Sequence, residues 1–81
     1  MEVILRLQCD ELLGGRIERE TPTGLVTVAR VARQDNGLVI HVTDERASAG
    51  LGYLQGLQAR DCNDLQRRIA RPDVTVTMPG V

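Results

Sequence analysis

The stretch from Leu25 to Thr43 constrains the fold more than any other part of the chain. Two runs rich in β-branched residues, 25–33 and 38–43, flank the tripeptide Asp35-Asn36-Gly37. β-Branched side chains fit a pleated surface, and Asn-Gly supplies the two positive-φ positions of a type I′ turn. The tripeptide also fits a three-residue loop with Gly37 in the left-handed region. Either loop predicts a β-hairpin.

The length of this loop decides which side chains share a face of the hairpin. A two-residue loop groups the second strand's Leu38, Ile40 and Val42 with Leu25, Ala29 and Val31. A three-residue loop groups them with Val26, Val28 and Ala32, because a slip of one residue turns every side chain over. In both registers the opposite face keeps apolar residues. We therefore expect both faces to be covered, and a chain of 81 residues has little with which to cover the second.

The remaining elements follow from periodicity. Alternation predicts strands over 2–8 and 74–78, and a charged edge strand over 16–21. Helical spacing over 51–70 predicts a helix with a buried stripe of Leu51, Leu54, Cys62, Leu65 and Ile69. A cap at Asp61 or Asn63 leaves open a break near Ala59. We predict one domain over residues 1–81, an α+β fold with a mostly antiparallel β-sheet (order β-β-β-β-α-β) and one long or broken helix packed on one face.

Composition limits both the core and the ligands. The chain has no Trp or Phe and a single Tyr, so the core must be aliphatic, and an oligomer or partner would add useful burial. The net charge of −1 argues against nucleic acid as the main ligand, because such domains usually carry a basic stripe. All ten basic residues are Arg, which is typical of a GC-rich bacterial or phage genome.

The sequence also bears on the compartment. No apolar run approaches the length of a membrane span, and the N-terminus has the pattern of a strand rather than of a signal peptide. We therefore expect a cytoplasmic protein. Cys9 and Cys62 are too few for a disulfide framework or a zinc cluster and are expected to be free and buried. A Cys9–Cys62 bond stays open, although a cytoplasmic location argues against it.

No catalytic group, metal site or cofactor site is expected from the sequence. The carboxylate pairs Asp10-Glu11 and Asp44-Glu45 flank strand ends, where side chains are usually solvated. His41, the single histidine, has no obvious partner for acid–base chemistry or metal binding and is expected to be structural. We predict that the protein is not an enzyme.

The favoured hypothesis is a small protein-binding or accessory protein of bacterial or phage origin. It would act through the second apolar face of the sheet, against another copy of itself as a homodimer or against another protein. Val39, His41 and Tyr53 are predicted to lie at or near that surface, the last because tyrosine is enriched in binding interfaces.

The alternative hypothesis is an anion- or nucleotide-binding module. Gly50, Gly52 and Gly56 follow a strand and open the predicted helix, where backbone N–H groups can hold a phosphate with help from Arg67 or Arg71. The glycine spacing departs from the usual dinucleotide pattern, so a tight turn with close packing explains it equally well. A third hypothesis, nucleic-acid binding through the helix arginines, ranks last because of the near-neutral charge.

Overall fold

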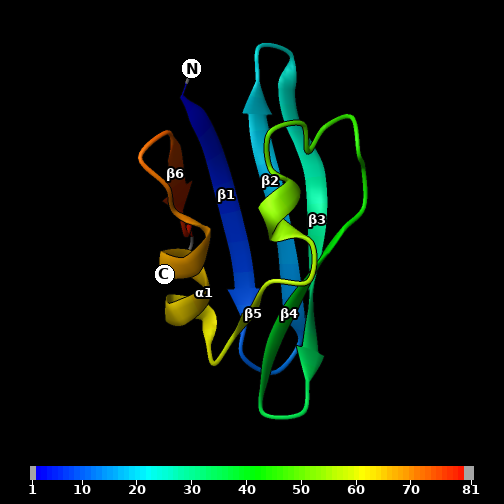
Figure 1. Cartoon of the computed structure of the whole chain (residues 1–81), viewed down its shortest axis with the longest axis vertical. Coiled ribbons are helices and arrows are strands. Elements are labelled where there is room, and N and C mark those ends of the chain that lie inside the picture. Colours follow the sequence, from blue (N-terminus) through cyan, green and yellow to red (C-terminus); the bar gives the residue numbers. More distant parts are fainter. Residues whose placement is uncertain (1, 80–81) are drawn as a thin grey trace.

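Six strands form one curled sheet in the computed structural model, which describes residues 2–79. They are β1 (Val3–Asp10), β2 (Gly14–Thr21), β3 (Gly24–Gln34), β4 (Gly37–Val42), β5 (Gln58–Ala59) and β6 (Val74–Thr77), shown in Figure 1. Their order is β5-β4-β3-β2-β1-β6, and neighbours are antiparallel except β1 and β6, which are parallel. A sheet-dominated, mostly antiparallel α+β fold is therefore confirmed.

The central hairpin has the shorter of the two loops. Gln34 pairs with Gly37, so the loop is Asp35-Asn36, and Leu38, Ile40 and Val42 face the odd-numbered residues of β3. The positive φ falls on Asp35, at 48°, and not on Gly37 as expected. Gly37 is needed for a different reason: a Cβ there would lie 2.5 Å from the carbonyl oxygen of Ala59 in β5. Because Gly37 has no side chain, the edge strand β5 can lie close to β4 at this point.

A β-bulge opposite the β2 step from Ile17 to Glu18 changes the side-chain pattern of β3. Ile17 pairs with Ala29 and Glu18 pairs with Thr27, which leaves Val28 as the extra residue. A bulge of this kind reverses the alternation beyond it. Val28 and Ala29 are both fully buried, whereas Leu25 is 43% exposed. The predicted grouping of Leu25 with Ala29 and Val31 is therefore wrong.

The predicted edge strand over 16–21 is an interior strand, because β2 lies between β1 and β3. Its charges do not prevent this. Arg16, Glu18 and Glu20 lie on the side of the sheet away from the core, which we call the outer face, and the guanidinium of Arg19 on the inner side donates to the carbonyls of Ala47 and Ala49. On the outer face, Arg6 pairs with Glu20 and Arg16 with Glu18, each at 3.6 Å. Ile17 on the other side is fully buried.

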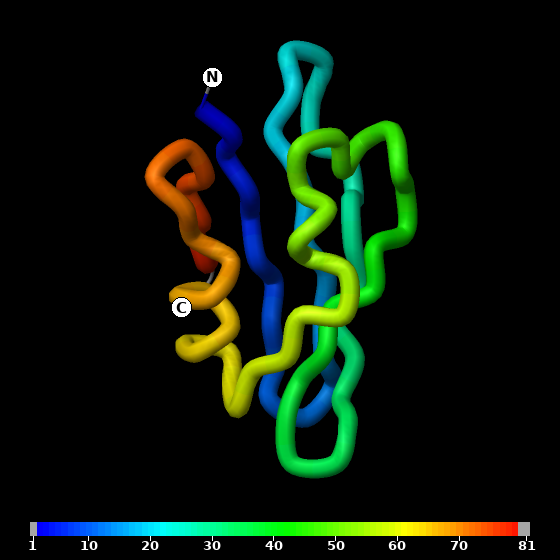
Figure 2. The backbone as a smooth tube through the Cα atoms, viewed as in Figure 1, coloured from blue at the N-terminus to red at the C-terminus, as the bar shows by residue number. Residues whose placement is uncertain are grey.

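The predicted long helix over 51–70 is wrong, and the alternative of a break near Ala59 is confirmed. The segment forms a 3-10 turn η1 (Gly52–Leu54), then β5, then α1 (Cys62–Ile69). Figure 2 shows the backbone crossing in front of the sheet before it reaches α1. The Gly56 N–H donates to the Ile40 carbonyl and the Ile40 N–H to Leu57, both at 2.9 Å, which holds this stretch along β4. The element order is therefore β-β-β-β-β-α-β, one strand more than predicted.

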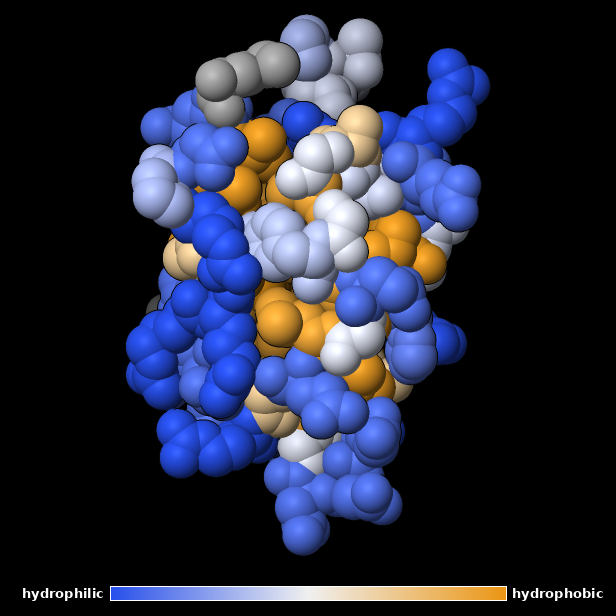
Figure 3. Space-filling model, in the orientation of Figure 1, coloured by the Kyte–Doolittle hydropathy of each residue, from blue (hydrophilic) through white to orange (hydrophobic). Residues whose placement is uncertain are grey.

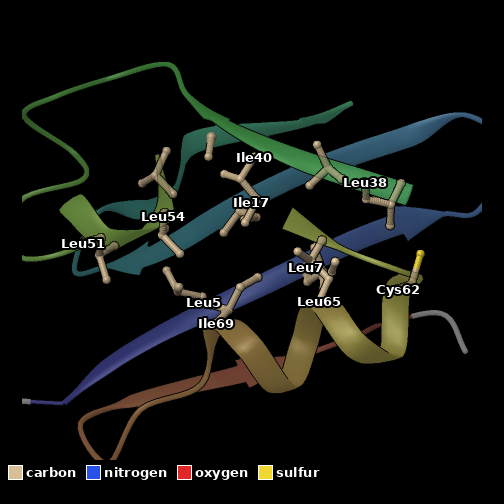
Figure 4. Close-up of a cluster of buried hydrophobic side chains, with 14 of the residues drawn as sticks. Leu5, Leu7, Ile17, Leu38, Ile40, Leu51, Leu54, Cys62, Leu65 and Ile69 are labelled. Carbon is tan, nitrogen blue, oxygen red and sulfur yellow. The ribbon is translucent and has the colours of Figure 1, made fainter. Parts of the chain in front are cut away.

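The core lies between the inner face of the sheet and the two helical segments (Figure 4). It is aliphatic, as predicted, and the apolar stripe assigned to the long helix is buried although two separate elements supply it. The largest fully buried side chains are Leu5, Leu7, Ile17, Ile40, Leu51, Leu54, Leu65, Ile69 and Val28.

A disulfide joins Cys9 to Cys62, so the expectation of two free cysteines is wrong. Cys9 is close to the end of β1, and Cys62 is the first residue of α1. The fold brings their Cα atoms to 5.8 Å, within the range that a disulfide spans. The bond fastens the start of α1 to the sheet.

Candidate functional site

The three residues predicted for an interface do not form one surface. Val39 and His41 alternate with core residues of β4 and therefore lie on its outer face, where Val39 is buried and His41 half-buried. Tyr53 belongs to η1, on the opposite side of the sheet. Its hydroxyl donates to the Ile69 carbonyl, and Arg71 stacks on its ring at 4.3 Å. Tyr53 thus fastens η1 to the end of α1, and burial raises the pKa of its hydroxyl while Arg71 partly offsets this.

The outer face is more polar than the hairpin alone suggested. Gln8, Arg16, Arg30 and His41 pair across four neighbouring strands and form one row. Arg16 and Arg30 are exposed. Together with the ion pairs Arg6–Glu20 and Arg16–Glu18, these residues give the face charged groups of both signs, rather than the second apolar surface that was expected.

The glycines of the anion-binding alternative do not open α1. Gly50 and Gly56 take φ values of 81° and 79°, which serve the turns on either side of η1. Gly50 and Gly52 line a hollow with Glu45, whose carboxylate would repel an anion. Arg67 pairs with Asp64 at 3.6 Å, and Arg71 donates to the carbonyls of Arg68 and Ala70. The structure does not assemble these glycines and arginines around one hollow.

The most conspicuous surface feature is a pair of leucines in the turn between β1 and β2. Leu12 is 73% exposed and Leu13 is 86% exposed. Asp10 organises the turn, since its Oδ1 accepts hydrogen bonds from the N–H of Leu12 at 2.7 Å and of Leu13 at 2.9 Å. Side chains of Asp commonly shape turns in this way. We call these two residues the leucine tip.

The leucine tip is anchored to the start of α1 through residues that precede it in the chain. The disulfide at Cys9 lies just before it, and the Glu11 carboxylate accepts a hydrogen bond from the Cys62 N–H at 3.5 Å. The β3–β4 turn lies at the same end of the sheet (Figure 1). Between them is a hollow of about 340 Å³, lined by Glu11, Leu12, Arg33, Asn36, Gly37, Leu38 and Arg60.

A buried carboxylate organises the arginines next to this hollow. Asp64 contacts Arg60 at 3.7 Å, Arg67 at 3.6 Å and Arg68 at 3.0 Å. Its Oδ2 also accepts the backbone N–H of Arg60 at 3.0 Å. That hydrogen bond, followed by the one from Arg68, lowers the pKa of Asp64 to about 2, against a small opposing effect of burial. Asp64 is therefore ionised at neutral pH and holds three guanidinium groups together.

Comparison with models of protein families, with curated proteins and with solved structures finds no match in any of the three. Function is therefore inferred from the chain's own geometry. Within residues 2–79, no three side chains of His, Cys, Asp or Glu are grouped as a metal site requires, and no helix is long and apolar enough to cross a membrane.

The sequence did not reveal the leucine tip, because residues 9–15 predict only a turn or a single helical turn closed by two glycines. A signal was present: two adjacent leucines stand where a turn usually carries polar residues, Gly or Pro.

Figure 3 shows the hydropathy of one face of the molecule. Apolar residues gather near the centre of the view, and hydrophilic residues surround them.

Proposed function

We propose that this chain is a small non-enzymatic protein-binding module that inserts its leucine tip into an apolar pocket of a different protein. The observation that carries the proposal is the exposure of Leu12 and Leu13 on a turn that is held rigid. Apolar side chains on a preorganised segment bind with a smaller loss of conformational entropy. The fixed turn has the character of such an anchor.

The energetics favour a concave partner of another kind over a second copy. Burying two leucines contributes roughly 3–6 kcal/mol, whereas association costs an estimated 4–15 kcal/mol. The partner must therefore add contacts around the tip. Two protruding tips that meet head to head cannot supply the roughly 800 Å² per protein that stable interfaces bury. A pocket that encloses the tip and continues onto Arg33 and Arg60 can supply this buried area. An acidic rim of that pocket would complement the two arginines.

A homodimer through the outer face of the sheet, as expected from the sequence, is less favourable because this face is rich in charged side chains. It carries the ion pairs Arg6–Glu20 and Arg16–Glu18 and the exposed Arg30. Homodimer interfaces are usually more apolar and poor in charged residues at their core. The proposal therefore assigns the partner role to a different protein.

The Cys9–Cys62 bond argues against the cytoplasmic location expected from the sequence. Disulfides persist in oxidising compartments and are rare in the cytosol. We propose that the module works in an oxidising compartment, and the origin in bacteria or phage stays a prediction from composition.

Site-specific photocrosslinking tests the proposed function. A benzophenone amino acid replaces Leu13 in one variant and Leu25 in a matched control, since Leu25 is also exposed but lies far from the turn on β3. In the cells that make the protein, we expect an adduct with a different protein from position 13 and none from position 25. Adducts only with further copies of the chain, or no adduct from position 13, would refute the proposal.

The captured partner then allows a quantitative test. Burial of the two leucines contributes roughly 3–6 kcal/mol, and each tenfold change in affinity corresponds to about 1.4 kcal/mol. Replacing both leucines of the tip with serine should therefore weaken binding by about 100-fold or more. Leu25→Ser should leave the affinity unchanged. Equal losses in both variants would show that the leucines do not form the contact.

A further inference from the structure

A second hollow adjoins the one next to the leucine tip, with which it shares Asn36 and Arg60. It has a volume of about 310 Å³ and is lined by Asn36, Gln58, Ala59, Arg60 and Arg68. The β3–β4 turn supplies the first of these residues, β5 the next two, the connection from β5 to α1 supplies Arg60, and the second turn of α1 supplies Arg68. Two stretches distant in sequence, the β3–β4 turn and residues 58–68, therefore place two guanidinium groups and two carboxamides around one space.

The two guanidinium groups are held in place from behind. Arg60 and Arg68 both contact Oδ2 of Asp64 through Nε, at 3.7 Å and 3.0 Å. Among the hydrogen bonds of residues 2–79, none uses the terminal nitrogens of these two arginines. Both side chains are more than half exposed, whereas that of Asp64 is buried. The terminal nitrogens are thus available to a ligand while the Nε groups fix the arginines.

The local charge favours an anion. Asp64 carries one negative charge and contacts three arginines. The neighbouring carboxylate of Asp61, which caps α1 by accepting the N–H of Asp64 at 2.8 Å, adds a second formal negative charge, so these five side chains have a net formal charge of +1. Arginine binds carboxylates and phosphates through paired N–H groups, and its planar fork selects oxyanions.

We infer that this hollow binds an oxyanion of the phosphate class, with Arg60 and Arg68 as the charged donors and the amides of Asn36 and Gln58 as neutral donors. The volume exceeds that of a single phosphate, so a phosphate ester fits as well as the free ion. The site differs from the glycine segment considered from the sequence, and it does not depend on the proposed role of the leucine tip.

The test is an NMR titration of the oxidised, full-length chain with inorganic phosphate and, separately, with methyl phosphate, each against chloride at equal ionic strength. We expect saturable shifts of the Nε–H signals of Arg60 and Arg68 and of the side-chain amides of Asn36 and Gln58. Saturation by both ligands identifies a site for phosphate esters, and saturation by inorganic phosphate alone identifies a site for the free ion.

Variants distinguish binding in this hollow from a general attraction of phosphate to the positively charged side chains of the protein. Arg60→Gln and Arg68→Gln should each weaken binding by at least about tenfold, because each removes a charge-assisted pair. Arg30→Gln, on the outer face, lowers the net charge equally and should not change the affinity. Shifts that stay linear with concentration, or equal losses in all three variants, would overturn the inference. Loss of the leucine tip should leave phosphate binding intact, so failure of the two proposals can be told apart.

Discussion

Breaking the disulfide should remove a large part of the stability of this domain. The bond closes a loop with a sequence separation of 53 residues between Cys9 and Cys62. In the chain-entropy description, a closed loop of this size restricts the unfolded state by about 14 cal/mol/K, or about 4 kcal/mol at 25 °C. Native domains are stable by only about 5–15 kcal/mol, and this one has a small aliphatic core. The reduced protein should therefore be only marginally folded.

Thermal and urea unfolding measure this loss directly. For a domain of this size 1 kcal/mol corresponds to about 4–8 °C, so reduction should lower Tm by roughly 15–30 °C. The urea m-value should rise, because the unfolded chain without a cross-link exposes more surface. The control is the Cys9→Ala/Cys62→Ala double variant, which should resemble the reduced protein and should not respond to reductant.

Two results would refute the reasoning. One is alkylation of both cysteines in the native, unreduced protein, which would mean that the bond does not form. The other is a Tm that falls by less than about 5 °C on full reduction. In that case the packing of Leu65 and Ile69 against the sheet, where both are fully buried, would hold α1 without the cross-link.

Three further predictions test the packing and the charges. The folded-state pKa of Asp64 is lowered to about 2, so its ionised carboxylate stabilises the fold fully above the unfolded pKa near 4, and this contribution is lost as pH falls through about 2. The urea midpoint should therefore fall as pH is lowered from about 4 to about 2, and it should fall less steeply in Asp64→Asn. Gly37→Ala should destabilise by about 1–3 kcal/mol in urea unfolding because its Cβ meets a β5 carbonyl. Gly52→Ala, with nothing within 4 Å of the new Cβ, should fall well below that range, and equal losses would contradict the close-approach argument. Tyr53→Phe removes the hydrogen bond to the Ile69 carbonyl and should cost about 1 kcal/mol, whereas an unchanged Tm would show that this bond contributes nothing.

Local patterns were sufficient to predict most of the strands. The hairpin over 25–43, the first strand and the last strand were recognised because β-branched composition and alternation are properties of short segments. The break in the helix predicted over 51–70 was also foreseeable. Asp61 is a good N-cap for a separate helix, and the glycines around residues 50–56 disfavour helix before it. What could not be read from this segment was β5, because two residues become a strand only when β4 lies beside them.

The candidate sites depended far more on tertiary structure. The hollow at Arg60 and Arg68 joins residues from the β3–β4 turn, β5 and α1, and no sequence spacing brings Asn36 next to Arg68. The predicted interface failed to assemble for the same reason: Val39 and Tyr53 are on opposite sides of the sheet.

By itself, the sequence determined an aliphatic, sheet-rich domain with its central hairpin, because backbone preference and hydropathy act over a few neighbouring residues. Only the tertiary structure decided that β2 is interior, that a bulge exposes Leu25, that Cys9 meets Cys62 and that Leu12 and Leu13 point to solvent. Each of these depends on which distant segments pack together, and burial is a property of the packed whole rather than of any one segment.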